Sequence, residues 1–161
     1  MVERDLYEPV RAWFERTLAD RFRRAKVKAY DTSRTRLCRF IERLGLQGAF
    51  PESGVWDIQA DITAFVLGRE NNVAVVECKT TPVTLKDVGQ ILGYSRVARP
   101  LVSTLLSVRP PSDSLQTLLS VYGRYDILEY ANDRRRILVV RWDPERNAIL
   151  HAETLPPGEH I

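Results

Sequence analysis

The chain has 161 residues, of which 44% are hydrophobic and 28% charged, with a net charge of +3. These values are ordinary for one globular domain with a core of its own, here residues 1–161. No apolar run approaches the roughly 20 residues that cross a bilayer, and charged residues follow Met1 at once, so we expect neither a membrane helix nor a signal peptide. Cys38 and Cys78 form no CxxC pair and have no histidine nearby, which argues against a zinc site and a disulfide framework. We therefore expect a cytoplasmic protein.

The positive charge is carried mostly by one residue type, since 20 of the 24 basic residues are arginine. A guanidinium group makes bidentate contacts to phosphate, which suits a surface that binds a nucleic-acid backbone. Biased codon usage would give the same excess, so both interpretations stay open.

An amphipathic helix is predicted from about Asp5 to Arg23, because apolar residues recur there three and four positions apart. Pro9 is tolerated in a first turn, so we expect the regular helix to begin near Tyr7. Extended backwards, this helix places Glu3 on its inner face, whereas Glu8 falls on the wet face. An acid on the inner face is the unusual one.

A short edge strand is predicted at 25–30, where polar and apolar residues alternate. A helix over about 33–44 follows, and Gly45 ends it. We expect arginines on the side opposite its apolar stripe, namely Arg34, Arg36, Arg39 and Arg43. Such a run is usually a solvated face, and a surface that follows phosphates is the alternative.

A central β-hairpin is predicted to open at Val55 and to turn within the polar stretch GRENN, centred on Glu70. In this register Asp61 lies opposite Lys79, and Glu77 lies on the same face as both because side chains alternate with period two. A slip of two residues would keep the three together, and a slip of one would separate them. Asp57, the other candidate acid, would lie beyond the hairpin. A simple Asp–Lys ion pair across the strands is the structural alternative.

The second half of the chain predicts a helix at 85–98, with Gln90 and Tyr94 on one side of it, and a buried strand at 101–108. Another amphipathic helix is expected at 114–125. Further strands are expected at 126–130, 136–142 and 148–152. Alternating helices and strands indicate an α/β layer fold.

The charged residues of the hairpin suit phosphodiester cleavage, which needs an attacking water and relief of charge on the phosphate. Mg²⁺ supplies much of this and prefers carboxylate and carbonyl oxygens. Asp61 and Glu77 would give two carboxylates, and the backbone carbonyl of Cys78 a third oxygen. Lys79 would hold or deprotonate the water, with its pKa lowered by the cation. Glu3 would complete the cluster from the first helix.

Asp61, followed by Glu77-Cys78-Lys79, resembles the motif of the PD-(D/E)XK nuclease superfamily, which includes restriction endonucleases, archaeal Holliday junction resolvases and RecB-type nucleases. The start of the chain, Val2 to Leu6, resembles the helix opening of the junction resolvases. That opening carries the superfamily's first acidic motif, and the match places Glu3 in the metal site.

A second match concerns the helix after the E-x-K motif. Gln90-Ile-Leu-Gly-Tyr94 resembles the QxxxY pattern of RecB-type nucleases, in which this helix contacts the substrate near the active site. One departure is that Gln59-Ala60, and no proline, precedes Asp61.

The resemblance covers about residues 1–108 and implies a three-layer, restriction endonuclease-like core, with a mixed central sheet flanked by helices. The helix at 33–44 would then be an insertion, and an αββ extension would begin near residue 110.

The activity that the resemblance implies is Mg²⁺- or Mn²⁺-dependent hydrolysis of DNA, endo- or exonucleolytic, in DNA repair, recombination or defence. The implied catalytic residues are Glu3, Asp61, Glu77, Lys79 and Gln90. The implied substrate contacts are Tyr94, Arg34, Arg36 and Arg39.

Two questions stay open at the level of the sequence. The alternative to a nuclease is a non-cleaving module that binds nucleic acid or protein and keeps the fold. A homodimer is a further hypothesis, because one active site per chain cuts one strand at a time. DNA is the expected partner, and the preferred DNA structure is not indicated.

Overall fold

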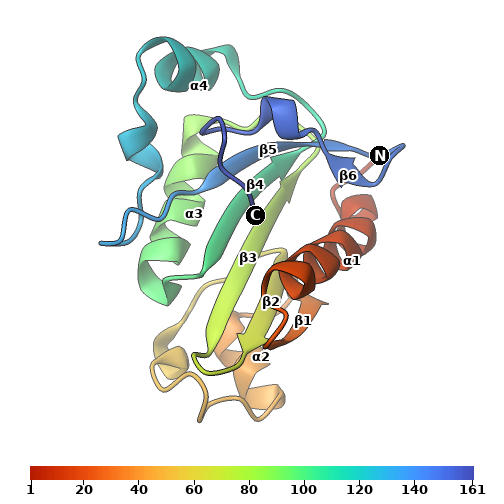
Figure 1. Cartoon of the computed structure of the whole chain (residues 1–161), viewed down its shortest axis with the longest axis vertical. Coiled ribbons are helices and arrows are strands. Elements are labelled where there is room, and N and C mark those ends of the chain that lie inside the picture. The colour runs from red at the N-terminus through yellow and green to blue at the C-terminus, as the bar shows by residue number, and fades with distance from the viewer.

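The computed structural model describes residues 1–161 as an α/β protein built on one mixed sheet of six strands (Figure 1). The strands lie side by side in chain order, and only the pairs β3–β4 and β4–β5 are parallel. Their bounds are β1 Lys26–Asp31, β2 Ile62–Leu67, β3 Asn72–Lys79, β4 Val102–Ser107, β5 Leu138–Asp143 and β6 Ala148–Ile149. β1 is an edge strand, as the alternation at 25–30 predicted.

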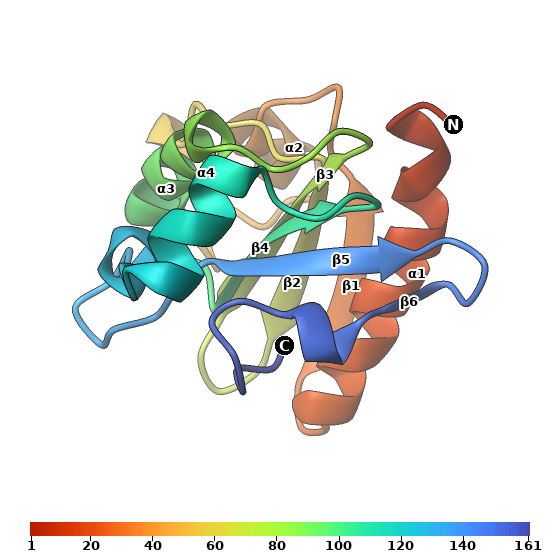
Figure 2. The same cartoon turned by 90° about the horizontal axis from the view of Figure 1, so that it is seen from above.

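Helices cover both faces of the sheet (Figures 1 and 2). One face packs against α1 (Arg4–Arg21), and the other against α2 (Leu37–Arg43), α3 (Leu85–Ala98) and α4 (Asp113–Gln116). Side chains of β3 alternate between these layers: Ala74, Val76 and Cys78 belong to the core under α1, whereas Val73 belongs to the core under α2. The α/β fold with a mixed, helix-flanked sheet is therefore confirmed. None of the helices combines the length and the apolar character that crossing a membrane requires.

The first helix begins earlier than predicted, at Arg4 rather than near Tyr7, and Pro9 lies inside it. The extra turn is held by two local bonds. Asp5 accepts the N–H of Val2 at 2.8 Å, and Glu3 accepts the N–H of Leu6 through its carbonyl at 2.9 Å. A carboxylate that satisfies free N–H groups at a helix start stabilises that start.

The register of the β2–β3 hairpin differs from the prediction by two residues: Ile62 pairs with Val76, and Val66 with Asn72. The turn is centred on Arg69 instead of Glu70, because Asn72 joins the ladder despite its polarity. A shift of two keeps every side chain on its predicted face.

The hairpin also starts later than predicted, at Ile62 instead of Val55, which lies in a 3-10 turn (Ser53–Val55). The reason is that the segment between Val55 and Ile62 forms backbone hydrogen bonds to the start of α2 and none to β3. The carbonyls of Trp56 and Ile58 accept the N–H groups of Cys38 and Leu37 at the helix start, at 3.2 and 2.8 Å.

The second helix is shorter than predicted, since α2 begins only at Leu37. Ser33 donates its N–H and its hydroxyl to the Asp31 carboxylate, at 3.0 and 2.6 Å, and this turn replaces the first helical turn. Arg34 therefore precedes the helix and Arg36 is its N-cap, so two of the four arginines are not on the helical face predicted for them. Gly45, with φ 68°, follows the helix as expected.

The predicted helix 85–98 matches α3, and the strand 101–108 contains β4. The strand predicted at 126–130 is reduced to one antiparallel bridge, Glu129 to Arg136. A 3-10 turn, Tyr125–Leu128, replaces the rest, next to a two-pronged ion pair from Arg124 to Asp126 at 2.7 and 2.9 Å.

The remaining predicted elements of the second half are shorter than expected. α4 passes into a π-helical turn over Thr117–Val121 instead of continuing to residue 125. The strand at 136–142 appears as β5, and β6 gives way to a 3-10 turn, His151–Glu153.

Candidate functional site

The predicted acids meet at one end of the sheet, where the start of β2 adjoins the end of β3. Asp61 directly precedes β2, and its Oδ2 accepts the backbone N–H of Cys78 at 2.8 Å. Glu77 and Lys79, on either side of Cys78, point to the opposite face from the buried Cys78 thiol. The antiparallel pairing thus brings together residues that lie 16 or more positions apart.

The segment before Asp61 is fixed by a threonine at the end of β1. The N–H of Thr32 donates to the carbonyl of Asp61 at 2.8 Å, and its hydroxyl donates to the carbonyl of Ala60 at 2.7 Å. The same hydroxyl lies 2.9 Å from that of Thr63, and both threonines are buried. Because buried hydrogen-bonded hydroxyls are costly to separate, this pair positions the carboxylate from behind.

A third support of Asp61, which no sequence pattern singled out, comes from the first helix. Tyr7 of α1 donates its hydroxyl to Asp61 Oδ1 at 2.8 Å. Burial, followed by this bond, raises the pKa of Tyr7, so the hydroxyl keeps its proton. The available signal was its spacing, four residues after Glu3 on the inner face of the helix.

Glu77 lies between a strand neighbour and a helix neighbour. Its Oε1 accepts Lys79 Nζ at 3.0 Å and Gln90 Nε2 at 3.5 Å, and it is only 7% exposed. Gln90 Nε2 also lies 3.4 Å from the hydroxyl of Tyr94, one turn further along α3. The predicted common side of Gln90 and Tyr94 is confirmed, and that side faces Glu77.

The cluster has more negative than positive charge. Burial, and then the Asp61 carboxylate, raise the pKa of Glu77 to about 7. Burial also raises the pKa of Asp61, against the bonds from Cys78 and Tyr7. Burial alone would lower the pKa of Lys79. The negative charges of Glu77, Glu3 and Asp61 outweigh the effect of burial, so the pKa of Lys79 is raised. The direction for Lys79 is the reverse of the lowering expected beside a cation.

Glu3 acts electrostatically on this cluster, whereas Glu8 and Asp57, the rival candidates for the positions of Glu3 and Asp61, form ion pairs outside it. Glu3 is the half-buried N-cap of α1, and its charge acts on both Glu77 and Lys79. Glu8 points outward and pairs with Arg11 at 2.7 Å, which lowers the pKa of Glu8. The remaining candidate, Asp57, is exposed and pairs with Arg36. Glu3 rather than Glu8 therefore acts on the charges of Glu77 and Lys79, and Asp61 rather than Asp57 lies at the junction of β2 and β3.

A divalent cation fits the chemistry of this site. No group of three or more His, Cys, Asp or Glu side chains is gathered in a metal-binding arrangement. Mg²⁺ is commonly held by one or two carboxylates together with waters, and Asp61 and Glu77 are the carboxylates that would serve here. Burial raises the pKa of both carboxyl groups, and a nearby cation would favour their charged forms. Cys78, between them, offers its carbonyl.

The three arginines proposed as substrate contacts lie beside the segment that leads to Asp61. Arg36 pairs with Asp57, and Arg39 pairs with Glu42 at 3.3 Å. Arg34 is exposed and has no acidic partner. Of the three, Arg34 is thus the one whose charge is free for a ligand.

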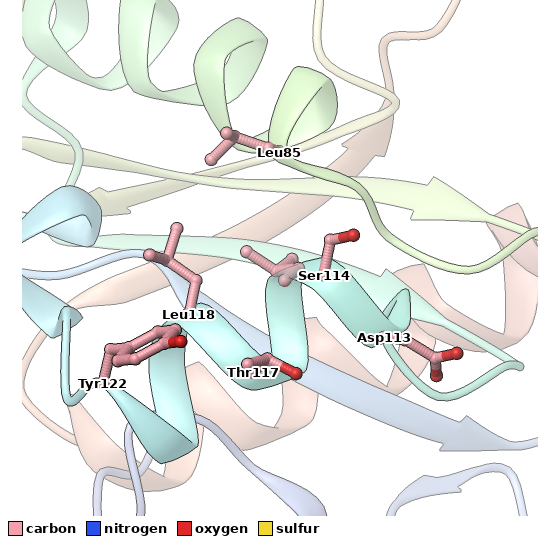
Figure 3. A pocket seen from close by; sticks show the side chains of 7 residues that line it. Leu85, Asp113, Ser114, Thr117, Leu118 and Tyr122 are labelled. Atoms are coloured by element: carbon pink, nitrogen blue, oxygen red, sulfur yellow. The ribbon is translucent and has the colours of Figure 1, made fainter.

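The main hollows of the surface lie elsewhere. One, of about 430 Å³, opens between Leu85 at the start of α3 and the α4 region, where Leu118 and Tyr122 form much of its wall (Figure 3). Its lining is largely apolar and includes none of the clustered residues. This cavity is therefore separate from the cluster of Asp61, Glu77 and Lys79.

Comparison of the chain with protein-family models, with curated proteins and with solved structures finds no match in any of the three.

Proposed function

We propose that the chain is a metal-dependent deoxyribonuclease, endo- or exonucleolytic, that hydrolyses phosphodiester bonds in DNA repair, recombination or defence. One observation carries the proposal: two carboxylates of raised pKa, Asp61 and Glu77, lie with the cationic Lys79 at the junction of two strands. Acids are rarely placed this way for stability, because burying their charges is costly.

The order of elements supports a restriction endonuclease-like core. α1 and β1 come first, the β2–β3 hairpin carries Asp61 and the E-x-K residues, and α3 leads into β4, parallel to β3. This is the order that the resemblance to PD-(D/E)XK nucleases implies, with α2 as the insertion. The elements from α4 to β6 would be the extension.

In this proposal each residue has a separate task. Asp61, Glu77 and the Cys78 carbonyl would hold Mg²⁺ or Mn²⁺, and Glu3 would add negative charge nearby. The bound cation would offset phosphate charge and make a water more acidic. Lys79 positions the attacking water beside Glu77, and Gln90 orients the Glu77 carboxylate. Tyr94, with the arginines before and within α2, contacts the DNA.

The test is cleavage of linear, single-stranded, flap and junction DNA in Mg²⁺ or Mn²⁺. We expect cleavage that EDTA abolishes and that Asp61→Ala or Lys79→Ala reduces about 100-fold or more. Asp57→Asn and Glu8→Gln are matched controls, since they remove acids outside the cluster, and both should cut normally. Absence of cleavage on every substrate by the folded wild-type protein would refute the proposal.

A non-cleaving nucleic-acid-binding or protein-interaction module is the second candidate. What favours it is that both oxygens of Asp61 already accept hydrogen bonds and that Glu77 already has Lys79 as a partner. Such a module would bind DNA equally well with and without divalent cations and would leave every substrate intact.

A further inference from the structure

A cluster of arginines without acidic partners lies at the other end of the sheet. The last residues of α1, the residues that follow it and the β2–β3 turn line a common cavity of about 570 Å³. Its arginines are Arg21, Arg23, Arg24 and Arg69. None of them forms an ion pair, although Asp20 and Glu70 line the same cavity.

Two more cavities are linked to this one, directly or through each other, by shared lining residues, and further arginines line them. Asn72 lines both the first cavity and a second one of about 310 Å³, and Arg99 lines both the second and a third of about 510 Å³. Arg96 and Arg135 line the third cavity as well. We call these seven arginines the basic band: Arg21, Arg23, Arg24, Arg69, Arg96, Arg99 and Arg135. Only Arg135 has an acidic partner, Asp133 at 2.8 Å.

Folding does not account for this arrangement. Seven arginines and four acids, Asp20, Glu52, Glu70 and Asp133, line the three cavities, so uncompensated positive charges that repel one another remain. The intramolecular bonds of Arg21 and Arg23 go to backbone carbonyls, those of His160 and Asp20. Their guanidinium charge is therefore left for a ligand that carries many negative charges.

We infer that the basic band binds the phosphate backbone of nucleic acid, at a surface separate from the acid cluster. Guanidinium groups match phosphate in a bidentate way, and a band across three cavities suits a repeating polyanion better than one small anion. The inference rests on the proposed function for the choice of nucleic acid over other polyanions. It does not require that the DNA be cut.

The position of the band sets a minimum length for a ligand that touches both surfaces. Asn72 and Lys79 mark the two ends of β3, which are about 23 Å apart at the rise of a strand. In Figure 1 the β2–β3 turn lies at the lower end of the sheet, far from the N-terminus of α1. A duplex needs about 8 base pairs to span that distance at roughly 3.4 Å per step.

The experiment compares two triple variants that lose the same charge. Arg23→Gln/Arg24→Gln/Arg69→Gln changes the basic band, and Arg124→Gln/Arg141→Gln/Arg146→Gln changes arginines that are paired with Asp126, Glu153 and Asp143. Binding of a 20-base-pair duplex is measured by fluorescence anisotropy in EDTA over a range of salt concentrations. EDTA keeps cleavage out of the measurement.

We expect the band variant to weaken binding and to reduce the slope of log affinity against log salt by about 2 to 3, since each lost phosphate contact removes about 0.9. The control should change the slope by less than about 1. Equal effects of both variants, or no effect of either, would overturn the inference. If the band variant does not fold, Arg69→Gln alone should still reduce the slope by about 0.9.

The outcomes also separate this inference from the proposed function. Cleavage by wild-type protein with unchanged binding by the band variant rejects the band and keeps the nuclease. Band-dependent binding without cleavage keeps the band and rejects the nuclease. Band-dependent binding to anionic phospholipid vesicles, without binding to DNA, would assign the band to a membrane surface and overturn the inference.

Discussion

At the scale of single residues, Glu77 links the site to the stability of the whole chain. Its carboxyl has an ordinary pKa of 4.5, which burial and Asp61 raise to about 7 in the folded protein. Between these two values the folded chain binds more protons than the unfolded chain. The contribution of Glu77 to the free energy of unfolding is therefore present at low pH and falls as the pH rises through this window.

Glu77→Gln removes this titration. We expect the variant to match the wild type near pH 4.5 and to exceed its free energy of unfolding by about 1 to 3 kcal/mol at pH 8. Urea denaturation at several pH values measures the difference. Glu8→Gln is the control of opposite sign, because Arg11 lowers the pKa of Glu8 and its loss is slightly destabilising at neutral pH. A Glu77→Gln advantage that does not change with pH would contradict the expectation.

Tyr7→Phe keeps the ring and removes the hydroxyl that donates to Asp61. Because a donor to the carboxylate favours its charged form, we expect the pKa of Asp61 to rise and the protein to lose about 1 to 2 kcal/mol of stability. A double-mutant cycle with Asp61→Asn measures the coupling between the two side chains. Additive effects would mean that the 2.8 Å contact contributes nothing.

At the scale of elements, α3 carries two glycines in its interior, Gly89 and Gly93. Both are exposed, and a methyl group built on either meets no atom within 4 Å. Glycine in a helix interior costs about 0.5–1 kcal/mol relative to alanine. No packing reason in the fold requires it.

Gly89→Ala and Gly93→Ala should each raise the free energy of unfolding by about 0.5–1 kcal/mol. Urea denaturation of the single variants and the double variant tests this, and the two effects should add. Gly45→Ala is the contrasting substitution, because the positive φ of 68° at Gly45 makes a side chain there unfavourable. Destabilisation by either α3 substitution would contradict the prediction.

The sequence predicted elements best where one local pattern decides the structure. Helix α3 has apolar periodicity with Thr84 and Asp87 as a capping box, and its bounds match the prediction. The start of α2 was wrong because its first N–H groups are satisfied by Ile58 and Trp56, about 20 residues away. Periodicity contains no information about such a partner.

The sequence predicted which side chains of β3 share a face, but not the hydrogen bonds that hold Asp61 in place. Glu77 and Lys79 share a face of β3 through strand parity, which survives a register error of two residues. Asp61 lies just before β2, and its carboxylate bonds to the Cys78 amide and to Tyr7 of α1. Thr32 lies in no motif, and its contact with Asp61 exists only because β1 pairs with β2. The geometry that fixes the carboxylate is thus a tertiary property.

At the scale of the whole molecule, a cation that binds the folded chain and not the unfolded chain must stabilise it. We expect Mg²⁺ to raise the melting temperature, and more so at pH 8 than at pH 6, because a protonated Glu77 competes with the metal. EDTA should reverse the shift. Asp61→Ala should abolish it, and Asp57→Asn should leave it unchanged. A shift that persists in Asp61→Ala would place the cation elsewhere.

Assembly belongs to the same scale. A nuclease with one site per chain needs two chains to cut both strands at once, so we propose a homodimer on DNA. Sedimentation of the protein with a 20-base-pair duplex in EDTA should give a complex of two chains. A strict 1:1 complex would reject the dimer without affecting the proposed chemistry.

The bond from the Cys78 amide to the Asp61 carboxylate makes the backbone itself a reporter of the site. The NMR frequency of an amide group that donates a hydrogen bond to a carboxylate changes when that carboxylate gains a proton or a cation. In ¹⁵N-labelled protein, the Cys78 signal should therefore move during pH or Mg²⁺ titration, while amides deeper in β3, such as that of Ala74, stay in place. Occupancy of the site then becomes visible without substrate, turnover or mutation.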